Sequence, residues 1–141
     1  MKLSFVIPAF NEESYLADCL ESILAQTRGL EASTEIIVVN NASCDRTREV
    51  ALRYRGVRVV DEWRKGLTFA RQAGFLASSG ALIANVDADS RLTPGWVECV
   101  LRSFDENSKL VALSGPFIYY DLTGSQRIFV RVFYLVAWTM Y

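Results

Sequence analysis

Four short apolar runs of strand length alternate along the chain with segments of helical periodicity, and this alternation constrains the fold more than any other feature. The runs cover residues 3–7, 35–39, 57–60 and 82–86. Strands that alternate with helices at intervals of roughly twenty to thirty residues are typical of right-handed βαβ units, in which the strands are parallel. The sequence therefore predicts an α/β fold with a mainly parallel central sheet and helices on both faces.

Helix and turn signals lie between these runs. The residues expected to begin the helices are Asn11, Asp45, Gly66 and the pair Thr93-Pro94. The helix that follows Asp45 is expected to run to about residue 55, and Gly80 is expected to end the helix after it. A fifth strand is expected at residues 110–113, followed by an extended segment at residues 117–120.

The composition excludes several classes of function. With 15 basic and 16 acidic residues, the formal net charge is −1, which argues against a surface that coats nucleic acid. The chain has no histidine, so it holds no Ser-His-Asp or Cys-His catalytic group of its own and no histidine metal ligand. The three cysteines form no CxxC pair, which is typical of free thiols in a reducing compartment. We therefore expect a cytoplasmic protein, peripheral to the inner face of a membrane if it contacts one.

Polar and aromatic side chains follow the predicted strands at the point where each strand ends. Ligands of a parallel sheet bind outside the carboxyl ends of its strands, which meet at one edge. The residues that the sequence places at this edge are Phe10, Glu12, Asn40, Asn41, Asp61, Asp87 and Asp89. Four strand ends that agree are stronger evidence than any single motif, so the sequence predicts one binding site at this edge.

Asp87 and Asp89 stand one residue apart, directly after the buried run at residues 82–86. Carboxylates at this spacing can share one hard cation, and Mg²⁺ is usually held by one or two carboxylates together with phosphate oxygens and water. Both acids are therefore predicted ligands of Mn²⁺ or Mg²⁺ and anchors for a diphosphate. The alternative interpretation is a solvated turn capped by Asp89.

Other residues near this edge suit a nucleotide. Phe10 can stack on a nucleobase or belong to the core, and the Asn41 amide can pair with a base edge or serve the turn. Arg64, Lys65 and Arg71 surround a glycine that opens a helix, which suits phosphate binding, although a solvated run of charge is the alternative. The chain has neither a P-loop nor a GxGxxG motif, so kinase-type and dinucleotide-cofactor functions have no support.

Four stretches together resemble the nucleotide-binding half of a family 2 glycosyltransferase of the GT-A fold, which is Rossmann-like. They are VIPAFNEE at residues 6–13, VNNASCDRT at residues 39–47, KGLTFARQAG at residues 65–74, and Asp87-Ala88-Asp89. The stretches occur in the order and spacing of the family between residue 3 and about residue 118, and together they are highly specific.

The resemblance implies a role for each matching residue. The residues that would bind the nucleotide are Pro8, Ala9, Phe10, Glu12, Asn41, Gly66, Arg71, Asp87 and Ala88. Asn41 would face the base, and Gly66 with Arg71 would lie near ribose or phosphate. Asp89 would be the principal metal ligand, and Asp87 would contact the ribose or assist the metal, so both acids would act catalytically on the leaving-group side. The family commonly has an aspartate at the position of Asn41, which leaves the base preference open.

The resemblance also implies a reaction for which this chain lacks one part. Inverting members carry a general base, an aspartate or glutamate, on a later segment, whereas no acid follows Asp121 here. We therefore expect a donor-binding domain that binds a nucleoside-diphosphate sugar through a metal, for transfer to a glycan, lipid or other acceptor, and that is inactive alone as a fragment of a longer enzyme. The alternatives are a non-catalytic sugar-nucleotide binding or assembly module and, with less support, a nucleotidylyltransferase.

The sequence predicts a nucleotide-sugar-binding domain at residues 1–120 and a separate apolar and aromatic segment at residues 121–141. Residues 127–141 are mostly apolar but fall short of the ~20 residues that a membrane-spanning helix needs. Arg127 and Arg131 beside aromatic residues suit a membrane interface. A helix that packs on a missing acceptor half is the alternative, and an exposed segment of this kind would favour a homo-oligomer.

Overall fold

The computed structural model describes residues 2–30, 33–115, 128 and 132. The chain divides into two compact units, Met1–Ser108 and Lys109–Tyr141, and the helices and strands named below lie in the first. The predicted boundary at residue 120 and the predicted extended segment at residues 117–120 lie outside the described residues and stay predictions. Among the described residues, no helix combines the length and the apolar character that crossing a bilayer requires.

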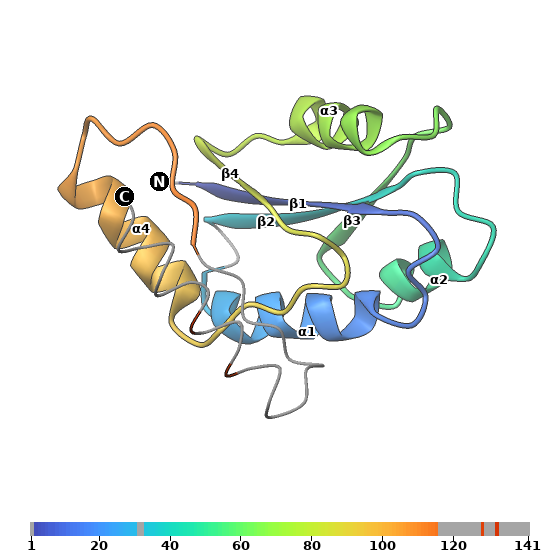
Figure 1. The fold of residues 1–141 in the computed structure, drawn as a ribbon, viewed down its shortest axis with the longest axis horizontal. Helices are drawn as coiled ribbons and strands as arrows, with labels where there is room; N and C mark the ends of the chain where they lie inside the picture. Colours follow the sequence, from blue (N-terminus) through green and yellow to red (C-terminus); the bar gives the residue numbers. More distant parts are fainter. Residues whose placement is uncertain (1, 31–32, 116–127, 129–131, 133–141) are drawn as a thin grey trace. The chain divides into compact units, whose positions relative to one another are not determined.

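The first unit is built on a four-stranded, all-parallel sheet with the strand order β3-β2-β1-β4. The strands are β1 (Leu3–Ala9), β2 (Thr34–Asn40), β3 (Val57–Asp61) and β4 (Leu82–Asn85), and Figure 1 shows them between two layers of helices. Every residue of β1 is buried, as expected for a central strand covered on both faces. The predicted α/β fold is confirmed.

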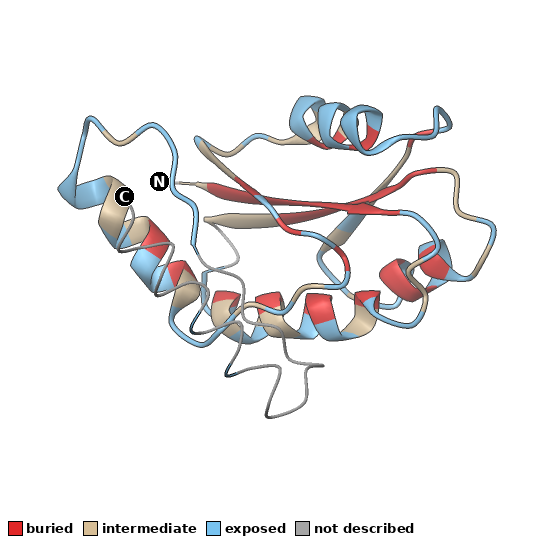
Figure 2. Cartoon of the chain, in the orientation of Figure 1, coloured by how far each residue is buried: buried red, intermediate tan, exposed pale blue. Residues whose placement is uncertain are grey.

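The helices cover both faces of the sheet, as predicted. They are α1 (Leu16–Thr27), α2 (Thr47–Leu52), α3 (Leu67–Ala77) and α4 (Trp96–Glu106). In Figure 1, α3 lies alone on one face, and α1, α2 and α4 lie on the other. Side chains alternate across a strand, so β1 sends Phe5 and Ile7 to the α1 face and Val6 to the α3 face. Figure 2 shows that the buried residues line the inner sides of these layers.

Two of the predicted helix starts are wrong. Asn11 does not cap α1, which begins at Leu16; it adopts a left-handed backbone conformation (φ 57°), and its Oδ1 accepts a hydrogen bond from the Cys44 N–H at 2.9 Å. Thr93-Pro94 does not form the first turn of α4. Gly95, with φ 82°, precedes Trp96, so the helix begins only after this left-handed residue.

Two further boundaries differ from the prediction. Helix α2 covers only Thr47–Leu52, with Asp45 Oδ1 accepting from the Thr47 N–H at 2.9 Å. Gly80 does not end α3, which stops at Ala77; a Cβ at Gly80 would lie 2.8 Å from the backbone nitrogen of Ser4, so glycine is required there by close packing.

The predicted strand at residues 110–113 is wrong. These residues are described and form no strand, and the side chain of Val111 is 93% exposed. An apolar run forms a stable strand only when a neighbouring strand pairs with it, and the described part of the chain offers these residues no such pairing.

Candidate functional site

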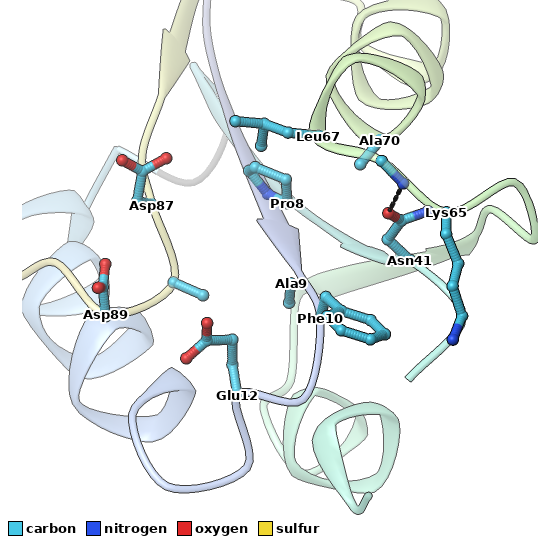
Figure 3. A pocket seen from close by; sticks show the side chains of 12 residues that line it. Pro8, Ala9, Phe10, Glu12, Asn41, Lys65, Leu67, Ala70, Asp87 and Asp89 are labelled. Atoms are coloured by element: carbon cyan, nitrogen blue, oxygen red, sulfur yellow. Dashed lines mark hydrogen bonds between the residues drawn. The ribbon is translucent and has the colours of Figure 1, made fainter. Parts of the chain in front are cut away.

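A pocket of about 600 Å³ opens at the carboxyl ends of the strands, and Figure 3 shows the side chains around it. Its lining comes from the end of β1, the residue after β2, the start of α3 and the loop after β4. The lining residues are Pro8, Ala9, Phe10, Glu12, Asn41, Lys65, Gly66, Leu67, Ala70, Asp87, Ala88 and Asp89. The structure thus brings together every residue predicted to bind nucleotide except Arg71, which reaches the site through Asp87.

The strand register explains this convergence. Ala9, Asn40 and Asp61 stand side by side at the ends of β1, β2 and β3, whereas β4 ends at Asn85, opposite Val6. The loop after β4 therefore continues beside the last residues of β1 to reach the pocket. At its start, the Val86 N–H donates to the Val6 carbonyl at 3.0 Å. Asn40 and Asp61, predicted at the same edge, do not line the pocket; they bind each other through Nδ2 and Oδ1 at 2.8 Å.

Buried and exposed residues alternate at the start of the loop after β4, and the exposed ones there are its two acids. Val86 and Ala88 are buried, and Asp87 and Asp89 between and beyond them are exposed toward the pocket (Figure 3). Beneath the loop, the Cys19 thiol of α1 lies 3.7 Å from the Asp87 carbonyl oxygen. Burial, followed by the charges of Asp89 and Asp87, raises the pKa of Cys19 to about 12, so the thiol stays protonated and can donate.

Three carboxylates line this end of the pocket, those of Glu12, Asp87 and Asp89 (Figure 3). Burial raises the pKa of Glu12, and the negative charges of Asp89, Asp45 and Asp87 raise it further. Arg71 supplies a positive charge, with Nη2 at 3.2 Å from Asp87 Oδ1. The concentration of negative charge favours a cation or a ligand hydroxyl at this end.

The opposite side of the pocket is aromatic and basic. The Phe10 side chain is 45% exposed, and Lys65 Nζ lies 5.1 Å from the centre of its ring, as Figure 3 shows. Lys65 was a predicted phosphate-binding residue, and it lines the pocket. Arg64, predicted for the same task, does not: its guanidinium pairs with Glu62 at 2.7 Å and lies over the Phe69 ring.

Asn41 lines the pocket with a side chain whose two amide hydrogens are both engaged and whose oxygen accepts one hydrogen bond. Its Nδ2 donates to the carbonyl oxygens of Glu62 at 3.0 Å and Arg64 at 2.7 Å. Its Oδ1 accepts from the Gly66 N–H at 2.8 Å, the dashed line in Figure 3. The predicted contact between Asn41 and a base stays a prediction, but both amide donors are engaged with the backbone.

Sequence reasoning missed the residues that hold Phe10 and Glu12 in place. The segment at residues 11–13 is bonded to the loop before α2 and to Thr47, the first residue of that helix. The Asn11 N–H donates to Ser43 Oγ at 3.1 Å, and the Glu12 N–H donates to Thr47 Oγ1 at 2.8 Å. The Glu13 N–H donates to Asp45 Oδ2 at 3.1 Å. Ser, Thr and Asp in one short loop are a general signal for backbone bonding, but a sequence does not name the distant partner.

Asp87 and Asp89 are the residues that could hold a divalent metal ion. Among the described residues, no group of three or more Cys, Asp or Glu side chains is arranged as a complete metal cage. A pair of carboxylates nevertheless fits Mg²⁺ or Mn²⁺, because such ions commonly keep waters and take phosphate oxygens as further ligands. The donor set therefore suits a metal bound together with a phosphate ligand.

The chain matches the family model described as "Glycosyl transferase family 2" over residues 4–134. Among curated proteins it is 32% identical over 113 residues to a putative glycosyltransferase, EpsH, of Bacillus subtilis, covering 77% of this chain and 32% of that protein. It is 29% identical over 132 residues to the glycosyltransferase GlyA of Streptococcus pneumoniae, covering 91% of this chain and 18% of that protein. The chain thus spans well under half the length of these relatives.

Solved structures share the fold. The TarS 1–349 structure of S. aureus covers 88% of this chain and 40% of its own, with 21% identity and a TM-score of 0.71. A glucosyl-3-phosphoglycerate synthase from Mycobacterium tuberculosis, in complex with Mn²⁺, UDP and phosphoglyceric acid, covers 73% of this chain and 38% of its own, with 27% identity and a TM-score of 0.61. Further TarS 1–349 structures are complexes with UDP and with UDP-GlcNAc.

Proposed function

The chain belongs to glycosyltransferase family 2, and from this premise we propose that its pocket binds the donor of the reaction, a nucleoside-diphosphate sugar. One observation carries the proposal: acids and an aromatic ring face each other across one pocket, with Asp87 and Asp89 on one side and Phe10 on the other. This spacing of unlike groups suits a ligand with a flat base at one end and a diphosphate at the other.

The proposal assigns a role to several residues in and beside the pocket. Phe10 stacks on the base, with Pro8 and Ala9 beside it, and Lys65 adds a positive charge at the rim. Gly66 and Arg71 lie nearest the ribose or the phosphates, and Asp87 accepts a hydrogen bond from a ribose hydroxyl or assists the metal. Asp89 is the principal ligand of Mn²⁺ or Mg²⁺. Such an ion supplies positive charge that stabilises the departing diphosphate.

A uridine nucleotide is the first donor to test, because UDP and UDP-GlcNAc are bound in TarS structures and UDP with Mn²⁺ in the mycobacterial synthase. Transfer to a glycan, lipid or other acceptor, with inversion, is proposed for the longer enzyme of which this chain would form the donor half. The same proposal covers a cytoplasmic location, contact of residues 127–141 with a membrane surface, and self-association through that segment.

One observation favours a second function for the chain taken alone. No acid follows Asp121, so no later carboxylate is present to deprotonate an acceptor hydroxyl. By itself the chain would then bind the donor without transferring the sugar. Slow release of free sugar from the donor, with no acceptor added, would favour residual transferase chemistry over a pure binding module.

Calorimetric titration with UDP-, GDP- and dTDP-sugars, with and without Mn²⁺, tests the proposal. We expect metal-dependent binding of at least one donor, and a loss of at least about tenfold in affinity for Asp89→Ala. Asp105→Ala, an exposed acid on α4, is the matched control and should bind like the unmodified chain. Binding that needs no metal and is unchanged in Asp89→Ala would refute the proposed site.

A further inference from the structure

The turn that joins β3 to α3 is bonded at three backbone groups by one side chain from the segment after β2. The Asn41 amide, directly after β2, bonds the backbone of that turn at the Glu62 carbonyl, the Arg64 carbonyl and the Gly66 N–H. Asn41 is 4% exposed, and its own N–H donates to the Ala9 carbonyl at 2.8 Å. Through its backbone N–H and its side-chain amide, Asn41 therefore joins the end of β1 and the turn after β3 to the segment after β2.

The turn carries part of the pocket wall. Lys65, Gly66 and Leu67 all line the pocket, and Lys65 lies over the Phe10 ring. Gly66 takes φ 139°, a conformation that side-chain-bearing residues rarely adopt, and its carbonyl begins α3 by accepting from the Ala70 N–H at 3.1 Å. A shift of this turn would therefore move both the basic rim and the start of α3.

From these contacts we infer that Asn41 is a positioning residue, whose amide fixes the turn at residues 62–66 and so sets the shape of the nucleotide pocket, instead of donating to the base. The inference rests on the proposed function. To donate to a base, Nδ2 would have to leave the carbonyl of Glu62 or Arg64. An abandoned buried carbonyl is costly, and the bond to Glu62 is fully buried.

Asn41→Asp separates positioning from base reading. A carboxylate can still accept from the Gly66 N–H, but it cannot donate to either carbonyl, and it repels both. We expect UDP, titrated calorimetrically with Mn²⁺ at pH 7.5, to bind at least about tenfold more weakly. Lowering the pH to about 5.5 should restore part of the affinity, since a neutral carboxyl can again donate one hydrogen bond.

The charged groups on the turn are Glu62, Arg64 and Lys65. Hydrogen bonds from Arg64 lower the pKa of Glu62 to about 2, so Glu62 does not titrate in this range. The unmodified chain, titrated at the same two pH values, corrects for other groups, Glu12 among them. Asn107→Asp makes the same chemical change at the exposed end of α4 and should leave UDP binding unaltered.

A second nucleotide sharpens the comparison. Uracil N3 carries a proton and cytosine N3 does not, so a carboxylate that reads the base would strengthen UDP binding and weaken CDP binding. A positioning role predicts that Asn41→Asp and Asn41→Ala weaken UDP and CDP by similar factors. Retention of UDP affinity in Asn41→Asp, with a selective loss of CDP, would overturn the inference.

Measurements on the Gly66 and Asn41 N–H groups distinguish failure of this inference from failure of the proposed function. Hydrogen exchange at the Gly66 N–H should be slow in the unmodified chain and at least about tenfold faster in Asn41→Ala. If the variants do not fold, the NMR signals of the Asn41 side-chain amide in the unmodified chain provide the test. They should exchange slowly and shift little when UDP is added. A fast-exchanging Gly66 N–H, or an Asn41 amide that shifts strongly with UDP, would contradict the inference. An unmodified chain that binds no nucleotide would contradict the proposed function instead.

Discussion

Arg71 Nη2 lies 3.2 Å from Asp87 Oδ1, so an ion pair joins α3 to the loop after β4, at a residue that lines the pocket. Both side chains are close to half exposed, at 44% and 49%. An exposed pair of this kind contributes little to stability. Under the proposed function, the pair would instead fix the position of the Asp87 carboxylate next to the diphosphate of the ligand.

We expect Arg71→Gln to lower the affinity for UDP with Mn²⁺ by about three- to tenfold while the melting temperature changes little. Arg71→Lys keeps the charge but loses the planar guanidinium, so its affinity for UDP should lie between those of Arg71→Gln and the unmodified chain. Calorimetry at two salt concentrations measures the effect, and Arg55→Gln, an exposed arginine outside the pocket, is the control. Equal affinities for Arg71→Gln and the unmodified chain would show that the pair does not act on the ligand.

Thr47→Val tests the bonds that hold residues 11–13. Thr47 is fully buried, accepts from the Glu12 N–H and donates to Asp45. Valine has nearly the same shape, so the loss should come from unpaired polar groups and amount to about 1–3 kcal/mol in the free energy of unfolding. Urea denaturation measures it, and the exposed Thr68→Val provides a comparison expected to stay within about 0.5 kcal/mol. If the free energy of unfolding is unchanged in Thr47→Val, these hydrogen bonds add nothing to stability.

Gly74→Ala tests the packing of α3 on the sheet. A Cβ at this position would overlap the Val6 side chain and lie 3.1 Å from Val39 Cγ2. Because both valines belong to buried strands, the overlap cannot be relieved cheaply, and we expect a loss of about 1–3 kcal/mol despite the better helix propensity of alanine. Gly115→Ala, where a Cβ meets nothing within 4 Å, is the matched control. Equal thermal stability of the two variants would contradict the close approach.

The loss of folding stability at low pH should depend on Glu35. Burial alone would raise the pKa of this carboxyl, but hydrogen bonds from the Ser4 hydroxyl and from the Ser79 N–H and hydroxyl outweigh it and lower the pKa from 4.5 to about 2. A depressed folded-state pKa contributes stability that is fully present above about pH 4.5 and is lost as the pH falls toward 2.

We therefore expect Glu35→Gln to be less stable by about 1–3 kcal/mol at pH 7, with the difference shrinking between pH 4.5 and pH 2. Urea denaturation across this range measures the trend. Glu106→Gln, an exposed acid at the end of α4, should show no such convergence. A difference that stays constant down to pH 2 would argue against the low pKa.

The sequence was sufficient to predict the sheet, and to predict residues that the structure brings together around one pocket, because both follow from local patterns. Short apolar runs such as the one that ends before Asp87 predict parallel strands, and the rule that ligands lie beyond strand ends needs no tertiary detail. The pocket lining then follows from the strand order, since β1 lies between β2 and β4.

The errors arose where a distant partner decides a local conformation. Asn11 has the side chain of a helix cap, but its Oδ1 is engaged by the Cys44 N–H from another loop. Gly80 looks like a helix terminator, yet the backbone of Ser4 is what requires it. The contact between Asn41 and a base is not one of these errors and stays a prediction; the structure adds that two carbonyl oxygens, from a turn more than twenty residues away along the chain, occupy the amide donors.

The wall of the pocket comes from segments that lie far apart along the chain, from Pro8 to Asp89, so no fragment shorter than residues 8–89 contains it. Ligand occupancy and global folding are consequently linked: the unfolded chain has no site, and any nucleotide bound here raises the free energy of unfolding of the whole unit by mass action. A ligand at one hundred times its dissociation constant would contribute about 2.7 kcal/mol. Thermal denaturation in the presence of candidate nucleotides is thus a direct assay for what this sheet edge recognises, even where no sugar is transferred.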